Sequence, residues 1–74
     1  MDRREDALHK FGRRLTDLRE RQKLTIAELA ARSGLDPQHI IQIEAGQIDF
    51  LVTDIYALAQ GLGMTPGQLL EPPG

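Results

Sequence analysis

Two histidines, His9 and His39, are the residues of this 74-residue chain best suited to proton transfer or metal binding. They fall in different predicted helices, and the chain contains no cysteine. No Ser-His-Asp set, glycine-rich phosphate loop or metal-ligand spacing accompanies them. The sequence therefore predicts that the protein is not an enzyme, and it predicts no catalytic residue, metal or cofactor.

A second kind of chemistry, hydrogen bonding by side-chain amides, is concentrated in the stretch SGLDPQHIIQIEAGQ, residues 33–47. The stretch contains Gln38 and Gln42 but no Lys or Arg, and Asp36 and Glu44 stand near the two ends of its predicted helix. A glutamine amide can donate to and accept from adenine at the same time in the DNA major groove. Because this helix is acidic at both ends, the positive charge that attracts a polyanion must come from other parts of the chain.

Positive charge is confined to the first part of the chain. Residues 1–32 hold nine basic and six acidic residues, a formal charge of +3, whereas residues 33–74 hold five acids and no base. Any attraction to a nucleic acid must then come from the first two predicted helices and the loop between them. The alternative is that these charges simply form a solvated surface.

The first predicted helix has one apolar stripe. Leu8, Phe11, Leu15 and Leu18 recur at spacings of three and four, which places them on one face of a helix from about residue 6 to residue 22.

Four further helices follow, each with start or stop signals. Three have a residue that can cap the first turn: Thr25, Asp36 and Thr65. Three are followed by a glycine: Gly34, Gly46 and Gly63. An apolar stripe predicts the helix that begins near residue 52: Ile55, Leu58, Ala59 and Leu62. No strand-like alternation appears, so the predicted class is all-α.

The length predicts a single domain over residues 1–74, with its core at about 8–71 and a frayed tail at 72–74. No apolar run approaches the roughly 20 residues that span a bilayer, and the charged start MDRREDALHK is no signal peptide. We therefore expect a cytoplasmic protein that does not contact a membrane. With no second domain, an attached sensor for a small-molecule effector is not expected.

The order of the predicted helices resembles a known family: a long first helix, two short helices joined by a glycine-containing turn, and two more. FGRRLTDLRERQKLTIAELAARSGLDPQHIIQIEAGQ and IYALAQGLGMTPGQLL are similar to the phage-repressor-like (Xre-type) helix-turn-helix family over about residues 8–71. The resemblance implies a compact five-helix, lambda-repressor-like DNA-binding domain with its helix-turn-helix at helices 2 and 3. It also implies a dimeric, sequence-specific transcriptional regulator that lays its third helix, about residues 37–45, in the major groove of double-stranded DNA.

Family positions transfer to this chain residue by residue. An ion pair between helices 1 and 3 is implied at Arg19 and Glu44. The implied contacts to base edges are Gln38, His39, Ile41 and Gln42. The implied contacts to phosphates are Thr25, Arg21, Lys23, Arg32 and Gln47. A homodimer is implied through the end of helix 4 and helix 5, with these candidate interface residues: Phe50, Leu51, Leu62, Met64 and Leu70.

The chain also departs from the family pattern. Ile26 replaces a phosphate-contacting Gln, and the loop after the third helix carries Asp49 where relatives often have bases. Losing cationic contacts weakens the salt-dependent part of DNA affinity. The apolar run around residues 48–52 and the outward position of Ile41 keep an alternative open. In that alternative the fold is a protein-protein interaction module, such as an antitoxin-like or accessory regulatory subunit.

Overall fold

The computed structural model describes residues 3–71, which form five helices. In chain order they are α1 (Arg3–Arg21), α2 (Ile26–Ser33), α3 (Pro37–Glu44), α4 (Val52–Gly61) and α5 (Pro66–Leu70). The all-α class and the five-helix architecture predicted from the sequence are confirmed. The predicted frayed tail at 72–74 lies outside the described residues.

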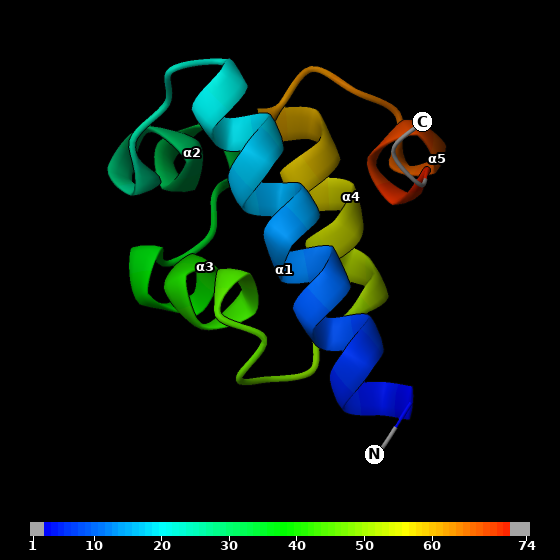
Figure 1. The fold of residues 1–74 in the computed structure, drawn as a ribbon. Helices are drawn as coiled ribbons and strands as arrows, with labels where there is room; N and C mark the ends of the chain where they lie inside the picture. The colour runs from blue at the N-terminus through cyan, green and yellow to red at the C-terminus, as the bar shows by residue number, and fades with distance from the viewer. Residues whose placement is uncertain (1–2, 72–74) are drawn as a thin grey trace.

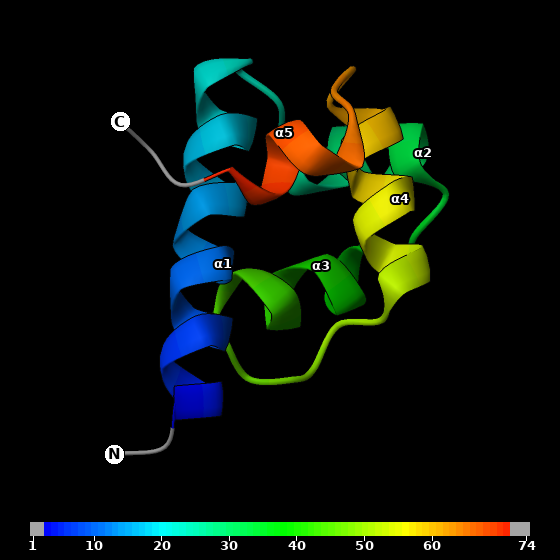
Figure 2. The same ribbon diagram turned by 90° about the vertical axis from the view of Figure 1, so that its right-hand side faces the viewer.

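In the view of Figure 1 the long α1 lies in front, with α2 and α3 to one side of it and α4 and α5 to the other. The view turned by 90° shows α3 and α5 crossing the space between α1 and α4 (Figure 2). Within residues 3–71, no helix combines the length and the apolar character needed to cross a bilayer.

Every helix contributes to one hydrophobic core. The largest fully buried side chains are Leu15, Leu29, Ile40, Ile43, Leu58 and Leu69. Burial of each such aliphatic side chain stabilises the fold by roughly 1.5–3 kcal/mol, which explains how a chain without disulfides holds five short helices together. Leu62, predicted to lie in a dimer interface, is also a core residue with 4% of its surface exposed. The buried position leaves this side chain little surface for a partner, because the backbone at the C-cap of α4 directs it inward.

The ends of α1 differ from the predicted ones. The helix begins at Arg3, before the apolar stripe. The negative charges of Glu5 and Asp6 in its first turn interact favourably with the positive end of the helix dipole. At its other end, Lys23 has a φ of 58°, so a lysine occupies the left-handed position that glycine usually takes. The backbone N–H of Leu24 then donates to the carbonyl of Arg19 at 3.1 Å, which closes the helix end.

A glycine brings α1 and α3 into close contact. A Cβ atom on Gly12 would lie 2.4 Å from the carbonyl oxygen of Glu44 and 2.7 Å from that of Ile43. Because these neighbours are backbone atoms, they cannot rotate away. The end of α3 is thus seated directly on the middle of α1.

Candidate nucleic-acid interface

The start of α2 is fixed by reciprocal hydrogen bonds. The Glu28 N–H donates to the Thr25 hydroxyl at 3.0 Å, and the Glu28 carboxylate accepts from the Thr25 N–H at 2.9 Å. Hydrogen bonding of its carboxylate to Thr25, above all to the backbone N–H, lowers the pKa of Glu28 below its ordinary value. The predicted cap at Thr25 is confirmed, and its reciprocal bonds with Glu28 fix the first turn of α2.

The turn into α3 follows the predicted pattern as well. Gly34 adopts a φ of 73°, which a side chain would strain. Asp36 then accepts from the backbone N–H of Gln38 at 2.8 Å. The first of the two acids that flank α3 is therefore occupied in capping that helix.

Opposite faces of α3 have different characters. Ile40 and Ile43 are buried in the core. Gln38 and Ile41 are exposed and Gln42 is half-buried, and their spacing of three and four places them along one outer strip. Within residues 3–71 neither glutamine side chain has a hydrogen-bond partner. The strip therefore offers two amides and one apolar surface to a ligand.

His39, grouped with the base contacts in the sequence prediction, is engaged inside the protein. Its Nε2 lies 3.0 Å from Oδ2 of Asp54 in α4. A carboxylate only accepts, so Nε2 carries the hydrogen of this bond and is not available to a base edge. Sequence reasoning missed Asp54, whose one signal was an acid in the first turn of a helix that lacks a capping residue.

Asp54 is the one polar residue of the described chain that is buried, with 4% of its surface exposed. Its Oδ2 accepts from the backbone N–H of Leu51 at 2.8 Å as well as from His39. The same oxygen atom thus caps the start of α4 and forms a hydrogen bond with His39 on α3.

The acid at the other end of α3 is neutralised by α1. Arg19 Nε and Nη2 donate to the two oxygens of Glu44 at 2.8 and 3.1 Å, and Arg19 Nη1 donates to the carbonyl of Leu24 at 2.8 Å. The hydrogen bond to Glu44 raises the pKa of Arg19 further, although burial opposes this change. The predicted pair is present, and it ties the end of α3 to α1 instead of leaving a free negative charge.

Asp49, which the sequence marked as repelling phosphate, is also paired. Arg4, near the start of α1, donates through Nε to Oδ1 of Asp49 at 3.0 Å. The exposed loop between α3 and α4 is therefore closer to neutral than its own sequence indicates. Sequence spacing gave no sign of this contact, because the two residues are 45 positions apart.

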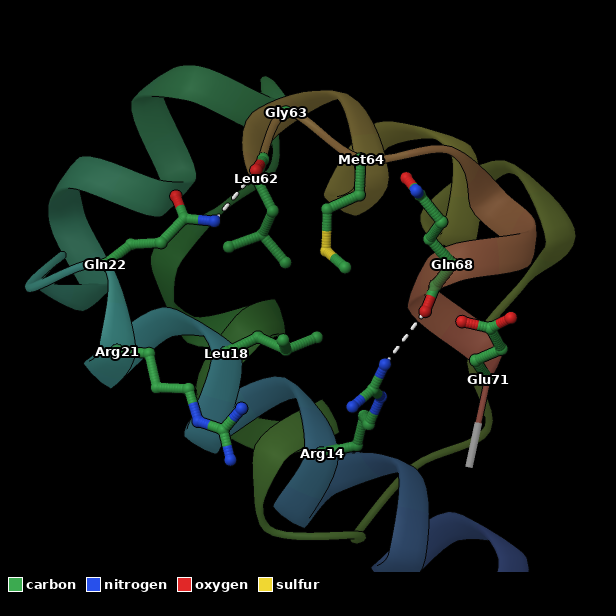
Figure 3. Close-up of a pocket in the computed structure, with 9 residues that line it drawn as sticks. All are labelled: Arg14, Leu18, Arg21, Gln22, Leu62, Gly63, Met64, Gln68 and Glu71. Carbon is green, nitrogen blue, oxygen red and sulfur yellow. Dashed lines mark hydrogen bonds between the residues drawn. The ribbon is translucent and has the colours of Figure 1, made fainter. Parts of the chain in front are cut away.

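The residues predicted to contact phosphates lie in two places. Thr25, Lys23, Arg32 and Gln47 are exposed at the ends of α2 and just after α3. Arg21 instead lines an open groove of about 480 Å³ between α1, the α4–α5 loop and α5, and it pairs with Asp17 at 2.9 Å. Figure 3 shows Arg21 among the side chains that line this groove, together with Leu62 and Gln68. Its position does not support a role beside α3.

Hydrogen bonds across the same groove hold α5 and the end of α4 to α1 and the turn that follows it. Arg14 Nη2 donates to the carbonyl of Gln68 at 2.9 Å, and Gln22 Nε2 donates to the carbonyl of Leu62 at 2.8 Å (Figure 3). These bonds satisfy carbonyls at or beyond helix ends. Their role is structural, and they lie apart from the outer strip of α3.

The remaining dimer candidates are unequally exposed. The rings of Phe50 and Phe11 have centroids 4.3 Å apart, so Phe50 is largely occupied by packing against α1. Met64 is half-buried. Leu51 and Leu70 are exposed, and two residues that the sequence prediction omitted are exposed with them: Val52 and Tyr56. Leu51, Val52 and Tyr56 begin α4 and are called here the α4 apolar face.

Comparisons with known proteins agree with this arrangement. A family described as a helix-turn-helix domain matches residues 10–72. An uncharacterized HTH-type transcriptional regulator, y4dJ, from Sinorhizobium fredii (strain NBRC 101917 / NGR234) is 36% identical over 61 residues, which are 82% of this chain and 79% of that protein.

Two solved structures are similar over most of their length. The restriction-modification controller protein C.AhdI from Aeromonas hydrophila has a TM-score of 0.84 and 37% identity, covering 88% of this chain and 98% of that one. A hypothetical transcription factor, NHTF, from Neisseria has a TM-score of 0.83 and 26% identity, covering 95% and 80%. The chain therefore belongs to the Xre-type helix-turn-helix family. It is a DNA-binding transcriptional regulator of that family, as the resemblance implied.

Proposed function

We propose that the chain is a homodimeric regulator that binds a two-fold symmetric site in double-stranded DNA and reads base edges with α3. The observation that carries this proposal is the outer strip of Gln38, Ile41 and Gln42 on a helix held at both ends. Gln can bond adenine bidentately, and an isoleucine side chain can contact a thymine methyl group. Glu44 does not oppose DNA as a free charge, because it pairs with Arg19, and the negative charge of Asp36 faces the positive N-terminal end of α3 that it caps.

Attraction to the phosphates comes from the residues around this strip. Lys23 and Arg32 are exposed near the two ends of α2, and the backbone N–H groups of Ile26 and Ala27, which the cap between Thr25 and Glu28 does not use, can donate to a phosphate. With so few cations per subunit, we expect modest affinity for a half-site. Affinity should fall with salt at a slope of about -0.9 per phosphate neutralised.

Dimerisation is proposed through the α4 apolar face. Leu51 is 65% exposed, Val52 73% and Tyr56 61%, which is unusual for three neighbouring large apolar residues in so small a domain. A second copy would cover this face and double the number of DNA contacts. Two-fold pairing would present two α3 helices to half-sites about one turn of DNA apart.

Selection from a random duplex library at low salt tests the function. The proposal expects an enriched palindrome, and Gln42→Ala should relax the preference at one base pair of each half-site, at a loss of about 1–3 kcal/mol. Gln60→Ala on α4 makes the same chemical change away from α3 and should leave the preference unchanged. No enriched motif, with Gln42→Ala equal to the wild type, would favour the protein-interaction module. Exposed Ile41 and the α4 apolar face would then be its contact surfaces.

A further inference from the structure

One side-chain contact bridges the outer helix α3 and the start of α4. His39 Nε2 lies 3.0 Å from Asp54 Oδ2, and the same oxygen accepts from the Leu51 N–H at 2.8 Å. In the described part of the chain no other side-chain hydrogen bond or ion pair joins these two helices. Their direct packing is also slight, because α3 packs mainly on α1 and α2 and α4 packs mainly on α2 and α5. Figure 2 shows that the loop between them leaves the far end of α3, beside α1, and runs below α3 to the start of α4.

Burial makes the contact strong and directional. The Asp54 side chain is 6% exposed and the His39 side chain 32%. Because the carboxylate only accepts, Nε2 keeps its hydrogen whether the imidazole is neutral or protonated. A hydrogen bond to an ionised acceptor in a nearly dry site is stronger than one between neutral groups. Removing the imidazole would leave Asp54 with the Leu51 N–H as its remaining donor.

We propose that His39 and Asp54 are positioning residues that fix the spacing of the two DNA half-sites. The inference rests on the proposed function, since it requires a dimer formed through the α4 apolar face. In that dimer the separation and rotation of the two α3 helices follow from the angle between α3 and the start of α4. The bridge holds this angle, because one oxygen of Asp54 binds both Leu51, at the edge of the dimer face, and His39, on α3.

The test compares His39→Ala with His39→Gln. The amide nitrogen of glutamine is as many bonds from the backbone as Nε2 of histidine, so it can keep the hydrogen bond to Asp54. Thr65→Ala is the control for general loss of stability, because it removes the cap of α5, far from α3. Duplexes carrying two copies of the selected half-site with different spacers are titrated at a temperature where circular dichroism shows each variant fully folded.

The wild type, His39→Gln and Thr65→Ala should prefer one spacer length. His39→Ala should lose about tenfold of its preference over neighbouring lengths, the factor expected for one hydrogen bond to a charged acceptor. Its base preference within each half-site should not change. If His39 only stabilised the fold, its removal would not change the spacer preference while leaving the base preference intact.

Three results overturn the inference while leaving DNA reading intact. They are an unchanged spacer preference in His39→Ala, an equal loss in Thr65→Ala, and a wild type that binds half-sites with no spacer preference. Failure of the wild type to select any DNA motif would instead contradict the proposed function itself.

Discussion

We expect that breaking the ion pair between Arg19 and Glu44 lowers the free energy of unfolding more than removing any other side chain outside the apolar core. Their side chains are 14% and 10% exposed, and two hydrogen bonds join them. In Glu44→Ala the guanidinium stays in place without its counter-charge. Breaking a buried pair in this way destabilises proteins by about 3–5 kcal/mol, and we expect about 3 kcal/mol here because both groups keep some contact with water.

The assay is urea unfolding followed by circular dichroism. A domain of this size has a total free energy of unfolding of roughly 4–11 kcal/mol. A loss of about 3 kcal/mol in Glu44→Ala should therefore either shift the urea midpoint clearly or leave the variant unfolded. Glu44→Gln keeps an acceptor and should lose less, which provides a measurable variant if the alanine variant does not fold. Replacing both partners, in Arg19→Met with Glu44→Leu, should recover most of the stability. A loss under about 1 kcal/mol in Glu44→Ala would refute the reasoning that the pair is desolvated.

Three other predictions concern separate parts of the fold. Gly12→Ala should lower the free energy of unfolding by about 1–3 kcal/mol, because its Cβ would meet backbone carbonyls of α3; an unchanged urea midpoint would contradict that crossing. The lowered pKa of Glu28 means that its contribution to stability is present above its ordinary value of 4.5 and is lost as pH falls through the lower folded value. The difference in stability between the wild type and Glu28→Gln, measured by urea unfolding across pH, should therefore shrink only in acid, and a difference that grows in acid would show the sign to be wrong. Tyr56→Asp should give a monomer in sedimentation equilibrium with unchanged far-ultraviolet circular dichroism, and a wild type that stays monomeric at high micromolar concentration and on DNA would exclude the proposed dimer.

Local signals in the sequence predicted most of the fold. The caps at Thr25, Asp36 and Thr65 and the glycine turn at Gly34 each depend on residues a few positions apart, and each is present in the structure. The pair of Arg19 with Glu44 came from the family resemblance and not from spacing. The left-handed Lys23 was missed because a lysine gives no signal for that conformation.

The parts of the site that sequence reasoning missed all depend on contacts between distant segments. The hydrogen bond of His39 to Asp54 and the pair of Arg4 with Asp49 form only when α1, α3 and α4 are packed together. Leu62 was assigned to a surface because its place at the end of a helix does not reveal which way it faces. The outer strip of α3 was predictable, because its periodicity follows from the buried Ile40 and Ile43.

The central claim is that the outer face of α3 reads DNA. Its most direct test is a titration of ¹⁵N-labelled protein with the selected duplex, followed residue by residue by NMR, with a scrambled duplex of equal length as the control. We expect the largest amide shifts specific to the selected duplex at residues 25–28 and 37–42, and the side-chain amides of Gln38 and Gln42 should shift with them. Shifts confined to the α4 apolar face or the groove beside α5, or equal shifts with both duplexes, would contradict it.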